Sequence, residues 1–512
     1  MRAGFAVLLW LQPSPLASQW IDAQLPLRGE LQFGLTGLSA TVNGRFLPDG
    51  TRQPSSAFLA VELDALVAPA LDTLDAVLAG LFPNLDLAAP QTSTLGPVSY
   101  DILFEQTRVP LSLTLGITGW LAPFVNVPFV RGRSFVVPQV DSAQALAGPG
   151  GSAFGGSPDL FLSGLNSSIV QLESIVAADT LPAGEQAAAA ALLADAQTLE
   201  TGLTDISDET YVPTGGGANG QALLQFYEAL RSGFEGFQVT LPDLELAQAV
   251  NGQEATALTS GPQFGIDPPS SQDTGWKFGD IEAGVSVQPI NTFGRSPSRG
   301  GSKFRVRGKF DALWRFATGS EPAASQIGDL GSGDGQPDLE LRSTFDVAWG
   351  QRLWLSAFAG YNIQFAGDIE RLITDPAAPI QIGAYTTPVR WDPGDILTLG
   401  VAPRFNLAQA VTISFVYFYQ HHGMDEVTPT AGTVTDDAFS LSDIEIGTEY
   451  STESLGFAIR YSSTSWTGEE RGPAIPAEVE LRYRKTVSGS QGFAPDVNVW
   501  QVGVRYYLKI LP

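Results

Sequence analysis

The stretch that decides the expected fold is LWLSAFAGYNIQF, residues 353–365. Its odd-numbered positions carry apolar residues and one tyrosine, while most of its even-numbered positions are small or polar. Trp354 and Phe358 are the exceptions on the even-numbered face. A period of two residues is that of an extended strand, whose successive side chains point to opposite faces. The sequence therefore predicts a β-strand with one apolar face.

The same alternation recurs along most of the chain, most clearly at residues 500–510, where the even-numbered positions are apolar or aromatic. Most of the predicted strands run for about 10 to 15 residues, whereas soluble strands average about 5 to 6. A tilted strand that crosses a bilayer needs about 9 to 11 residues. The pattern predicts strands at 29–36, 101–117, 120–136, 278–290, 303–317, 338–349, 352–365, 395–406, 409–421, 441–451, 454–465, 477–487 and 497–510.

A soluble β-sandwich would also alternate, but its strands are shorter and its aromatic residues are not gathered at strand ends. Here five tryptophans resemble the interfacial girdle of a membrane barrel: Trp120, Trp349, Trp354, Trp466 and Trp500. We therefore predict an all-β transmembrane antiparallel barrel with helical loop insertions. Bacterial barrels have an even number of strands, so the thirteen predicted strands imply a barrel of 12 or 14.

The connections between the predicted strands fall into two classes, as barrels require. We assign the short turns to the periplasm: 119–120, 350–351, 406–409 and 451–454. We assign the longer connections to the outside: 318–336, 366–392 and 422–438.

Composition excludes several classes of function. The 512 residues contain no cysteine, which excludes disulfides, thiolate metal sites and cysteine nucleophiles. The net charge of −26 argues against a nucleic-acid partner, whose phosphates require a basic surface. Only 16% of the residues are charged, against about a quarter in an average soluble domain.

The first residues resemble a secretory signal. Arg2 precedes an apolar stretch at residues 3–11, and the small residues Ala17 and Ser18 follow. We interpret 1–23 as a signal peptide whose cleavage point stays open, the alternative being a short buried helix. Residues 27–512 then form a single barrel in the outer membrane of a Gram-negative bacterium.

Two insertions depart from the strand period. Residues 57–82 have leucines at helical spacing, with Pro69 as a kink or break. Residues 137–273 contain three further predicted helices, at 157–180, 183–206 and 219–234. Since a strand begins soon after the signal, we expect any plug to come from these insertions. They either fold into the lumen or cap its mouth, and both interpretations remain open.

The inward face of the barrel is expected to be charged. Opposite charges on adjacent strands can pair across the ladder, so these residues either fill the interior as a salt-bridged wall or form a basic ladder that tunes solute passage. The predicted lumen-lining residues are Lys303, Arg305, Arg307, Lys309, Arg342, Arg404, Arg460, Arg482, Arg484, Arg505, Glu282, Glu340, Glu445 and Glu480.

No catalytic or metal constellation emerges. The two histidines, His421 and His422, are neighbours on a strand and point to opposite faces, so at most one could serve a nucleophile. The segment 329–340 contains Asp329, Asp334 and Asp338, but it departs from the calcium-loop spacing and is expected to be a turn. The sequence predicts no enzyme activity, no metal and no cofactor.

A family resemblance supports the same fold. GWKFGDIEAGVSV at 275–287 resembles the G-x-GD-(I/V)-E-x-G strand of the outer-membrane proteins grouped as the meta-pathway phenol-degradation family. Residues 317–319 are similar to that family's Pro-Thr-Gly, and 329–336 to its GTGDGQ-x-D segment. The resemblance implies a porin-like barrel, similar to hydrocarbon transporters. Such transporters carry an N-terminal hatch before the barrel, whereas here a strand is expected soon after the signal. The sequence ends in Ile510-Leu511-Pro512 rather than in an aromatic residue.

Two functions follow as hypotheses. The first is an outer-membrane channel for passive uptake or export of small apolar or aromatic solutes. The second is a structural or surface-binding barrel with a blocked lumen. The expected partners are outer-membrane lipid, lipopolysaccharide and a small-molecule solute, and the oligomeric state stays open.

Overall fold

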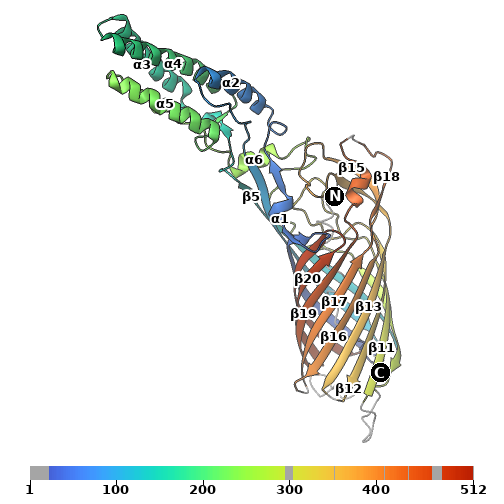
Figure 1. The fold of residues 1–512 in the computed structure, drawn as a ribbon. Helices are drawn as coiled ribbons and strands as arrows, with labels where there is room; N and C mark the ends of the chain where they lie inside the picture. The colour runs from blue at the N-terminus through green and yellow to red at the C-terminus, as the bar shows by residue number, and fades with distance from the viewer. Residues whose placement is uncertain are drawn as a thin grey trace. The chain divides into compact units, whose positions relative to one another are not determined.

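Twelve long strands form a closed antiparallel barrel in the computed structural model, which describes residues 22–293, 304–350, 352–408, 410–435, 438–463 and 476–510 (Figure 1). The barrel strands are β1 (Glu30–Phe46), β4 (Pro97–Leu115), β5 (Leu121–Val140), β10 (Glu282–Asn291), β11 (Phe304–Arg315), β12 (Asp338–Trp349), β13 (Leu353–Gln364), β16 (Ile396–Asn406), β17 (Val411–His422), β19 (Tyr450–Ser462), β20 (Ala477–Ser490) and β21 (Ala494–Lys509). The lower of the two predicted strand numbers is confirmed.

The first strand closes the ring. β1 pairs with β21 from Glu30↔Lys509 to Phe46↔Ala494, and it also pairs with β4 from Leu31↔Leu115 onward. Every barrel strand therefore has a neighbour on both sides. A closed ladder satisfies its own backbone hydrogen bonds, which is the condition for a β-structure to cross a bilayer.

The two faces of the wall differ in polarity, as the alternation predicts. On β13, Leu353, Leu355 and Tyr361 are exposed, whereas Ser356 and Asn362 are buried. The alternation on β21 is the same, with its apolar even-numbered residues outside. In an isolated chain these apolar side chains face solvent, so the face they form is the one that meets lipid tails.

The predicted aromatic girdle is confirmed in part. Trp120 and Trp349 are exposed at the end of the barrel with short turns, and Trp500 is exposed within β21. Two residues depart from the prediction. Trp500 lies in the interior of β21 and not at a strand end. Trp354 is 8% exposed on the inward face and packs against Phe293, at a ring-centroid distance of 5.0 Å. Trp466 lies outside the described residues.

The predicted strand 441–451 is wrong, and it is the extra strand that made thirteen. Its first half is a 3-10 helix, η5 (Leu441–Glu445), which starts with a capping box between Ser440 and Asp443. A reciprocal cap of this kind starts a helical turn and opposes an extended backbone. β19 begins only at Tyr450, so the predicted turn 451–454 is also wrong and lies inside that strand.

Two predicted long loops contain regular structure. β14 (Gly367–Ile373), β15 (Tyr385–Asp392) and β18 (Glu426–Pro429) form a separate three-stranded sheet in the connections that follow β13 and β17. Its core contains Ile373, Val389 and Trp391, each less than 9% exposed. The charged residues within 368–371 interrupt the apolar pattern, so the sequence did not predict this hairpin.

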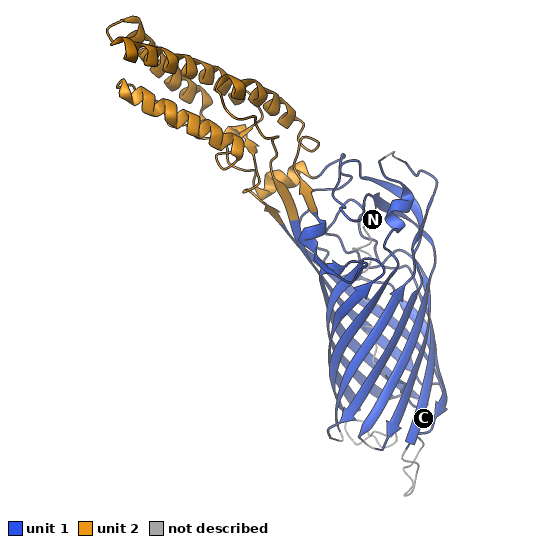
Figure 2. Cartoon of the chain, in the orientation of Figure 1, with its two compact units in different colours: residues 1–59, 100–137, 260–512 blue, residues 60–99, 138–259 orange. Residues whose placement is uncertain are grey.

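A second compact unit comprises residues 60–99 and 138–259, coloured separately in Figure 2. Its helices are α2 (Ala70–Asn84), α3 (Pro158–Ala177), α4 (Ala183–Ser207), α5 (Ala218–Gly236) and α6 (Gly252–Leu258), and its short strands include β3 (Ala60–Glu62), β6 (Ala147–Pro149) and β7 (Tyr211–Pro213). Helical spacing thus located α3, α4 and α5 correctly. The first unit also contains β2 (Arg52–Pro54), α1 (Ser55–Phe58), β8 (Gln272–Asp273) and β9 (Lys277–Phe278).

The predicted helix 57–82 is correct only after Pro69, which caps α2. The residues before it form α1, β3 and a turn, because a proline ends or begins a helix more readily than it continues one. By length and composition, α3 is apolar enough to cross a membrane. Its Phe161, Leu165 and Leu172 are nevertheless buried within the bundle.

The second unit is held by close helix packing. A Cβ on Gly202 of α4 would lie 2.3 Å from Cδ1 of Leu81, which places α2 directly against α4. Leu71, Leu74 and Leu78 of α2 are fully buried. Glycine at a helix crossing allows such a close approach, because it has no side chain to separate the two backbones.

Candidate functional site

Charged side chains fill inward positions of the barrel and pair with one another, both within a strand and between strands. Arg108 of β4 lies 3.1 Å from Glu282 of β10, and Arg315 of β11 lies 3.5 Å from the same carboxylate. Arg315 also pairs with Asp338, and Arg342 donates to Glu340 at 2.6 Å. Buried charges are tolerated only when they are paired in this way.

A second group of inward-facing charges lies mainly on β19, β20 and β21. Arg460 of β19 pairs with Glu480 of β20 at 2.7 Å, and Arg505 of β21 pairs with Glu478 at 2.6 Å. Arg404 of β16 lies 4.0 Å from Asp346. The Nη2 atom of Arg404 has no hydrogen-bond partner among the described residues.

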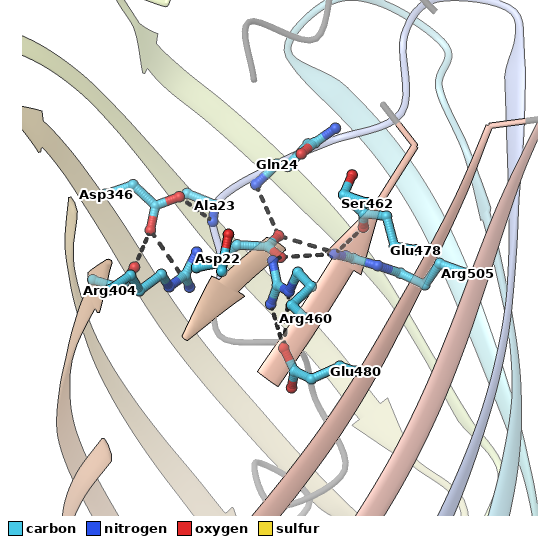
Figure 3. Close-up of polar contacts among 12 residues, drawn as sticks. Asp22, Ala23, Gln24, Asp346, Arg404, Arg460, Ser462, Glu478, Glu480 and Arg505 are labelled. Carbon is cyan, nitrogen blue, oxygen red and sulfur yellow. Dashed lines mark hydrogen bonds and ion pairs between the residues drawn. The ribbon is translucent and has the colours of Figure 1, made fainter. Parts of the chain in front are cut away.

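The start of the N-terminal segment 22–27, from Asp22 to Gln24, lies inside this charged wall (Figure 3). One carboxylate oxygen of Asp22, Oδ2, accepts from Nη1 of Arg460 at 2.8 Å and from Nη2 of Arg505 at 2.7 Å. The backbone N–H of Ala23 donates to Asp346 at 3.0 Å. The expectation that any plug must come from the two insertions is therefore wrong, since residues before the first strand enter the lumen.

Asp22 is only 2% exposed, and its charge state is set by competing effects. Burial opposes ionisation of the carboxyl. The guanidinium groups of Arg505 and Arg460 outweigh burial and hold the pKa of Asp22 well below its usual range. The carboxyl is therefore ionised at neutral pH, and it acts as a counter-ion that the chain itself inserts among the arginines.

A cavity adjoins this segment. It has about 730 Å³ of empty space, including the part open to solvent. Gln24, Leu25 and Pro26 form one side, and the barrel wall contributes Phe124 and Lys309 among others. Polar and apolar groups therefore face the same space.

The predicted lumen-lining residues differ in how deeply the structure buries them. Eight are buried on the inward face: Glu282, Arg307, Glu340, Arg342, Arg404, Glu480, Arg482 and Arg505. Four are half-buried at inward positions: Arg305, Lys309, Arg460 and Arg484. Whether any of them lines a conducting route stays a prediction.

Two predicted residues do not join this group. Lys303 lies outside the described residues. Glu445 was wrongly placed on a barrel strand: it ends η5, where its carboxylate accepts from the backbone N–H of Val427 at 2.6 Å.

Sequence reasoning missed Asp22 and Arg108. Arg108 was detectable, because it alternates with outward residues along β4 in step with the buried Gln106. Asp22 gave no signal, since it follows an apolar N-terminus and belongs to no periodic element.

The three sequence segments that carry the family resemblance meet at one place. Asp280 accepts from the backbone N–H groups of Thr318 and Gly319, at 3.0 and 2.7 Å. Ser332 donates its hydroxyl to the carbonyl of Phe278 at 2.8 Å. The motif therefore fixes the connection between β11 and β12 against the start of β10.

Burial raises the pKa of Asp280 to about 6, and the nearby charge of Asp334 adds to the effect.

The carboxylate of Asp329 accepts hydrogen bonds from the backbone N–H groups of Ala323 and Gly331. Within the described residues, no group of three or more His, Asp or Glu side chains is arranged to hold a metal ion.

Comparison with known proteins gives structural likeness alone. No family model matches the chain, and no curated protein matches it. Among solved structures, an outer membrane channel from Pseudomonas putida F1 is 7% identical with a TM-score of 0.42, covering 96% of this chain and 98% of that one.

Two further structures are similar at a lower score. The monoaromatic hydrocarbon channel CymD is 9% identical with a TM-score of 0.28, covering 99% and 95% of the two chains. A Pseudomonas aeruginosa FadL homologue is 8% identical with a TM-score of 0.24, covering 99% and 96%. The twelve strands form a closed ring, and the outer face of that ring is apolar. On these two observations, the chain is a bacterial outer-membrane β-barrel.

Proposed function

We propose that the chain is a channel through which small apolar or aromatic solutes cross the outer membrane passively. One observation carries the proposal: the lumen contains a short segment, residues 22–27, that has neither helix nor strand. Its contacts with the wall include ion pairs and hydrogen bonds of Asp22 and Ala23. Such a segment can leave the lumen while the ladder stays intact, because none of its residues belongs to a barrel strand.

The adjoining cavity favours solutes that combine an apolar body with a polar group. Phe124 and Leu25 offer apolar surface, whereas Lys309 and Asn126 offer a cation and an amide. Pockets that bind small ligands usually combine a mainly apolar lining with a few polar groups that set orientation. Both groups have partners in the wall, since Lys309 pairs with Asp311 at 3.1 Å and Asn126 donates to Glu282 at 2.9 Å. They would share these contacts with the polar group of a solute.

The second candidate, a structural barrel with a blocked lumen, is favoured by the number of ion pairs around Asp22. In that case the segment would be a permanent part of the interior. The two functions differ in one measurable property, which is whether the purified barrel conducts.

The test is single-channel recording and liposome uptake on the full-length protein. Arg484 is the informative residue: its guanidinium lies 4.9 Å from the ring of Phe418, and it forms no ion pair with a described carboxylate. We expect the channel to conduct and Arg484→Gln to lower its preference for anions, because an uncompensated charge facing the lumen is removed.

Arg390→Gln is the matched control, since Arg390 is exposed on β15 and pairs with Asp368. We expect this variant to keep the original selectivity. A barrel that admits neither ions nor aromatic solutes, even after Asp22→Ala, would establish the blocked-lumen alternative.

A further inference from the structure

The carboxylate of Asp22 lies where the carboxylate of a solute could bind. Its Oδ2 atom is shared by two guanidinium groups, those of Arg460 and Arg505, at 2.8 and 2.7 Å. The two arginines come from β19 and β21, so the wall and not the segment sets their spacing. Hydrogen bonds between an ionised donor and an ionised acceptor are the strong ones, and arginine is the residue best suited to carboxylates.

The wall does not need Asp22 to remain paired. Arg460 keeps Glu480 as a partner, and Arg505 keeps Glu478, at 2.7 and 2.6 Å. Removing the segment would therefore leave a folded wall with an excess of positive charge. Arg404 adds to that excess, because it lies 4.0 Å from Asp346, a carboxylate already bonded to Arg307 at 2.7 Å.

The cavity provides a route to Arg505, one of the two arginines that hold Asp22. Arg505 and Asp22 both line it, together with Leu25, Pro26 and Phe124 (Figure 3 shows the polar part of this site). A small solute held against Phe124 and Leu25 would have its polar end directed to the charged part of the lining. An aromatic monocarboxylate has this combination of groups.

We propose that Asp22 occupies a carboxylate-binding site of the lumen and that an aromatic monocarboxylate displaces it, so that residues 22–27 act as a ligand built into the chain. The proposal rests on the proposed channel function and names the class of solute. Displacement exchanges one carboxylate for another, so the charge of the site is the same before and after.

The test measures binding of benzoate to the full-length protein in detergent by titration calorimetry. Asp22→Ala vacates the site, and we expect it to bind benzoate about tenfold or more tightly than the unmodified protein, because the competing carboxylate is gone. Asp22→Asn keeps the size of the side chain and serves if the alanine variant fails to fold. Benzyl alcohol, which lacks the charge, should bind the two proteins equally.

Two further variants complete the design. Asp49→Ala removes an exposed carboxylate from the turn after β1 and should leave benzoate binding unchanged. Arg505→Gln in the Asp22→Ala background should abolish the gain. Equal benzoate affinity with and without Asp22, or a gain that survives Arg505→Gln, would overturn the proposal.

The mature protein must also retain Asp22, so the proposal requires that signal cleavage fall before this residue. The intact mass of the protein purified from outer membranes measures the cleavage point. We expect a chain that includes Asp22, and a mature chain that starts after it would overturn the proposal while leaving the barrel unaffected.

Conduction separates this proposal from the channel function. Benzoate binding that depends on Asp22 in a barrel that never conducts would refute the channel and keep the site. A conducting barrel whose benzoate affinity ignores Asp22 would keep the channel and refute the site.

Discussion

At the scale of single residues, the barrel inverts the polarity of a soluble protein. Its charged side chains are buried in the interior, whereas large apolar side chains such as Phe415 and Leu455 are exposed. Asp346, for example, is fully buried and bonded to both Arg307 and Ser356. Whether a residue suits its position therefore depends on which face of the wall it occupies, and this face alternates from one residue to the next along the strand.

Glycine at inward positions makes room for aromatic rings, and Gly400 is the tightest case. A Cβ at this position would lie 1.9 Å from the ring of Phe358 on the neighbouring strand. We expect Gly400→Ala to destabilise the barrel by about 1–3 kcal/mol, the usual cost of overpacking. Urea unfolding in detergent, followed by tryptophan fluorescence, measures the change.

Gly37→Ala is the matched control for that substitution. Gly37 lies within β1, and a Cβ at this position would have the carbonyl oxygen of Val502 as its nearest neighbour, at 4.0 Å. The substitution should leave the unfolding midpoint nearly unchanged. Equal effects of the two substitutions would show that the ring of Phe358 does not limit the space at Gly400.

Asp280 predicts a dependence of stability on pH. Its pKa in the folded protein is raised to about 6 by burial and by Asp334, above the usual value of 3.8. The folded state therefore binds the proton more tightly than the unfolded state. The free energy of unfolding should fall as pH rises from about 4 to about 6, then level off.

Asp280→Asn should flatten this dependence and raise stability above pH 6, by on the order of 2 kcal/mol. The amide oxygen can still accept from Thr318 and Gly319. Asp368→Asn, at an exposed ion pair with Arg390, is the control. Urea midpoints at a series of pH values provide the measurement, and an unchanged pH profile in Asp280→Asn would contradict the assignment.

At the scale of elements, the sequence predicted every barrel strand, because sustained period-two alternation is a specific signal of an extended strand. For β1 it predicted only the first part, 29–36, of a strand that runs to Phe46. The prediction failed where the alternation extended over only a few residues. Residues 441–449 alternate briefly, but the reciprocal cap at Ser440 and Asp443 stabilises a helical turn instead. The hairpin of β14 and β15 was missed for the opposite reason, since charged residues interrupt its short apolar face.

The small sheet of β14, β15 and β18 is expected to be a separate cooperative element. Ile373 is fully buried in its core beside Val389 and Trp391. Ile373→Ala should destabilise this sheet by about 2–5 kcal/mol, the range for removing a buried aliphatic side chain. Limited proteolysis should then cut within 365–395 and 423–449 while the barrel keeps its resistance to unfolding.

Ile382→Ala is the comparison, because Ile382 is 41% exposed in the same connection. It should not alter the cleavage pattern. Unchanged protease resistance in Ile373→Ala would mean that the sheet draws its stability from elsewhere.

At the scale of the whole molecule, charge is divided unequally between the two units. Residues 60–99 and 138–259 contain twenty aspartates and glutamates and a single basic residue, Arg231. Most of the net charge of −26 therefore belongs to the helical unit. Repulsion among like charges opposes compact packing and is screened by salt.

We expect the helices of this unit to melt at a higher temperature when salt is raised from about 20 mM to about 500 mM, because screening weakens that repulsion. The helical circular dichroism signal measures the midpoint, and the β-sheet signal of the barrel serves as an internal reference. A midpoint that stays constant or falls would mean that the acidic side chains are too well separated to repel one another.

The interior of the lumen was the part least accessible from sequence. The alternation of inward and outward positions along each strand identified the arginines and glutamates of the wall, since each lies on a strand with a clear outward face. Asp22 belongs to no strand, and its partners Arg460 and Arg505 lie more than 400 positions away along the chain. Only the closed ring brings them within bonding distance.

The pairing of β1 with β21 has a consequence for biogenesis. Strands far apart along the polypeptide complete the ring, so a nascent chain exposes two open edges until the sixteen residues of β21, Ala494–Lys509, have been made and secreted. Until then most of its lipid-facing surface already exists, while its hydrogen bonding is incomplete. Unpaired strand edges favour edge-to-edge aggregation, so a premature stop codon ahead of Ala494 should abolish membrane insertion rather than merely weaken it.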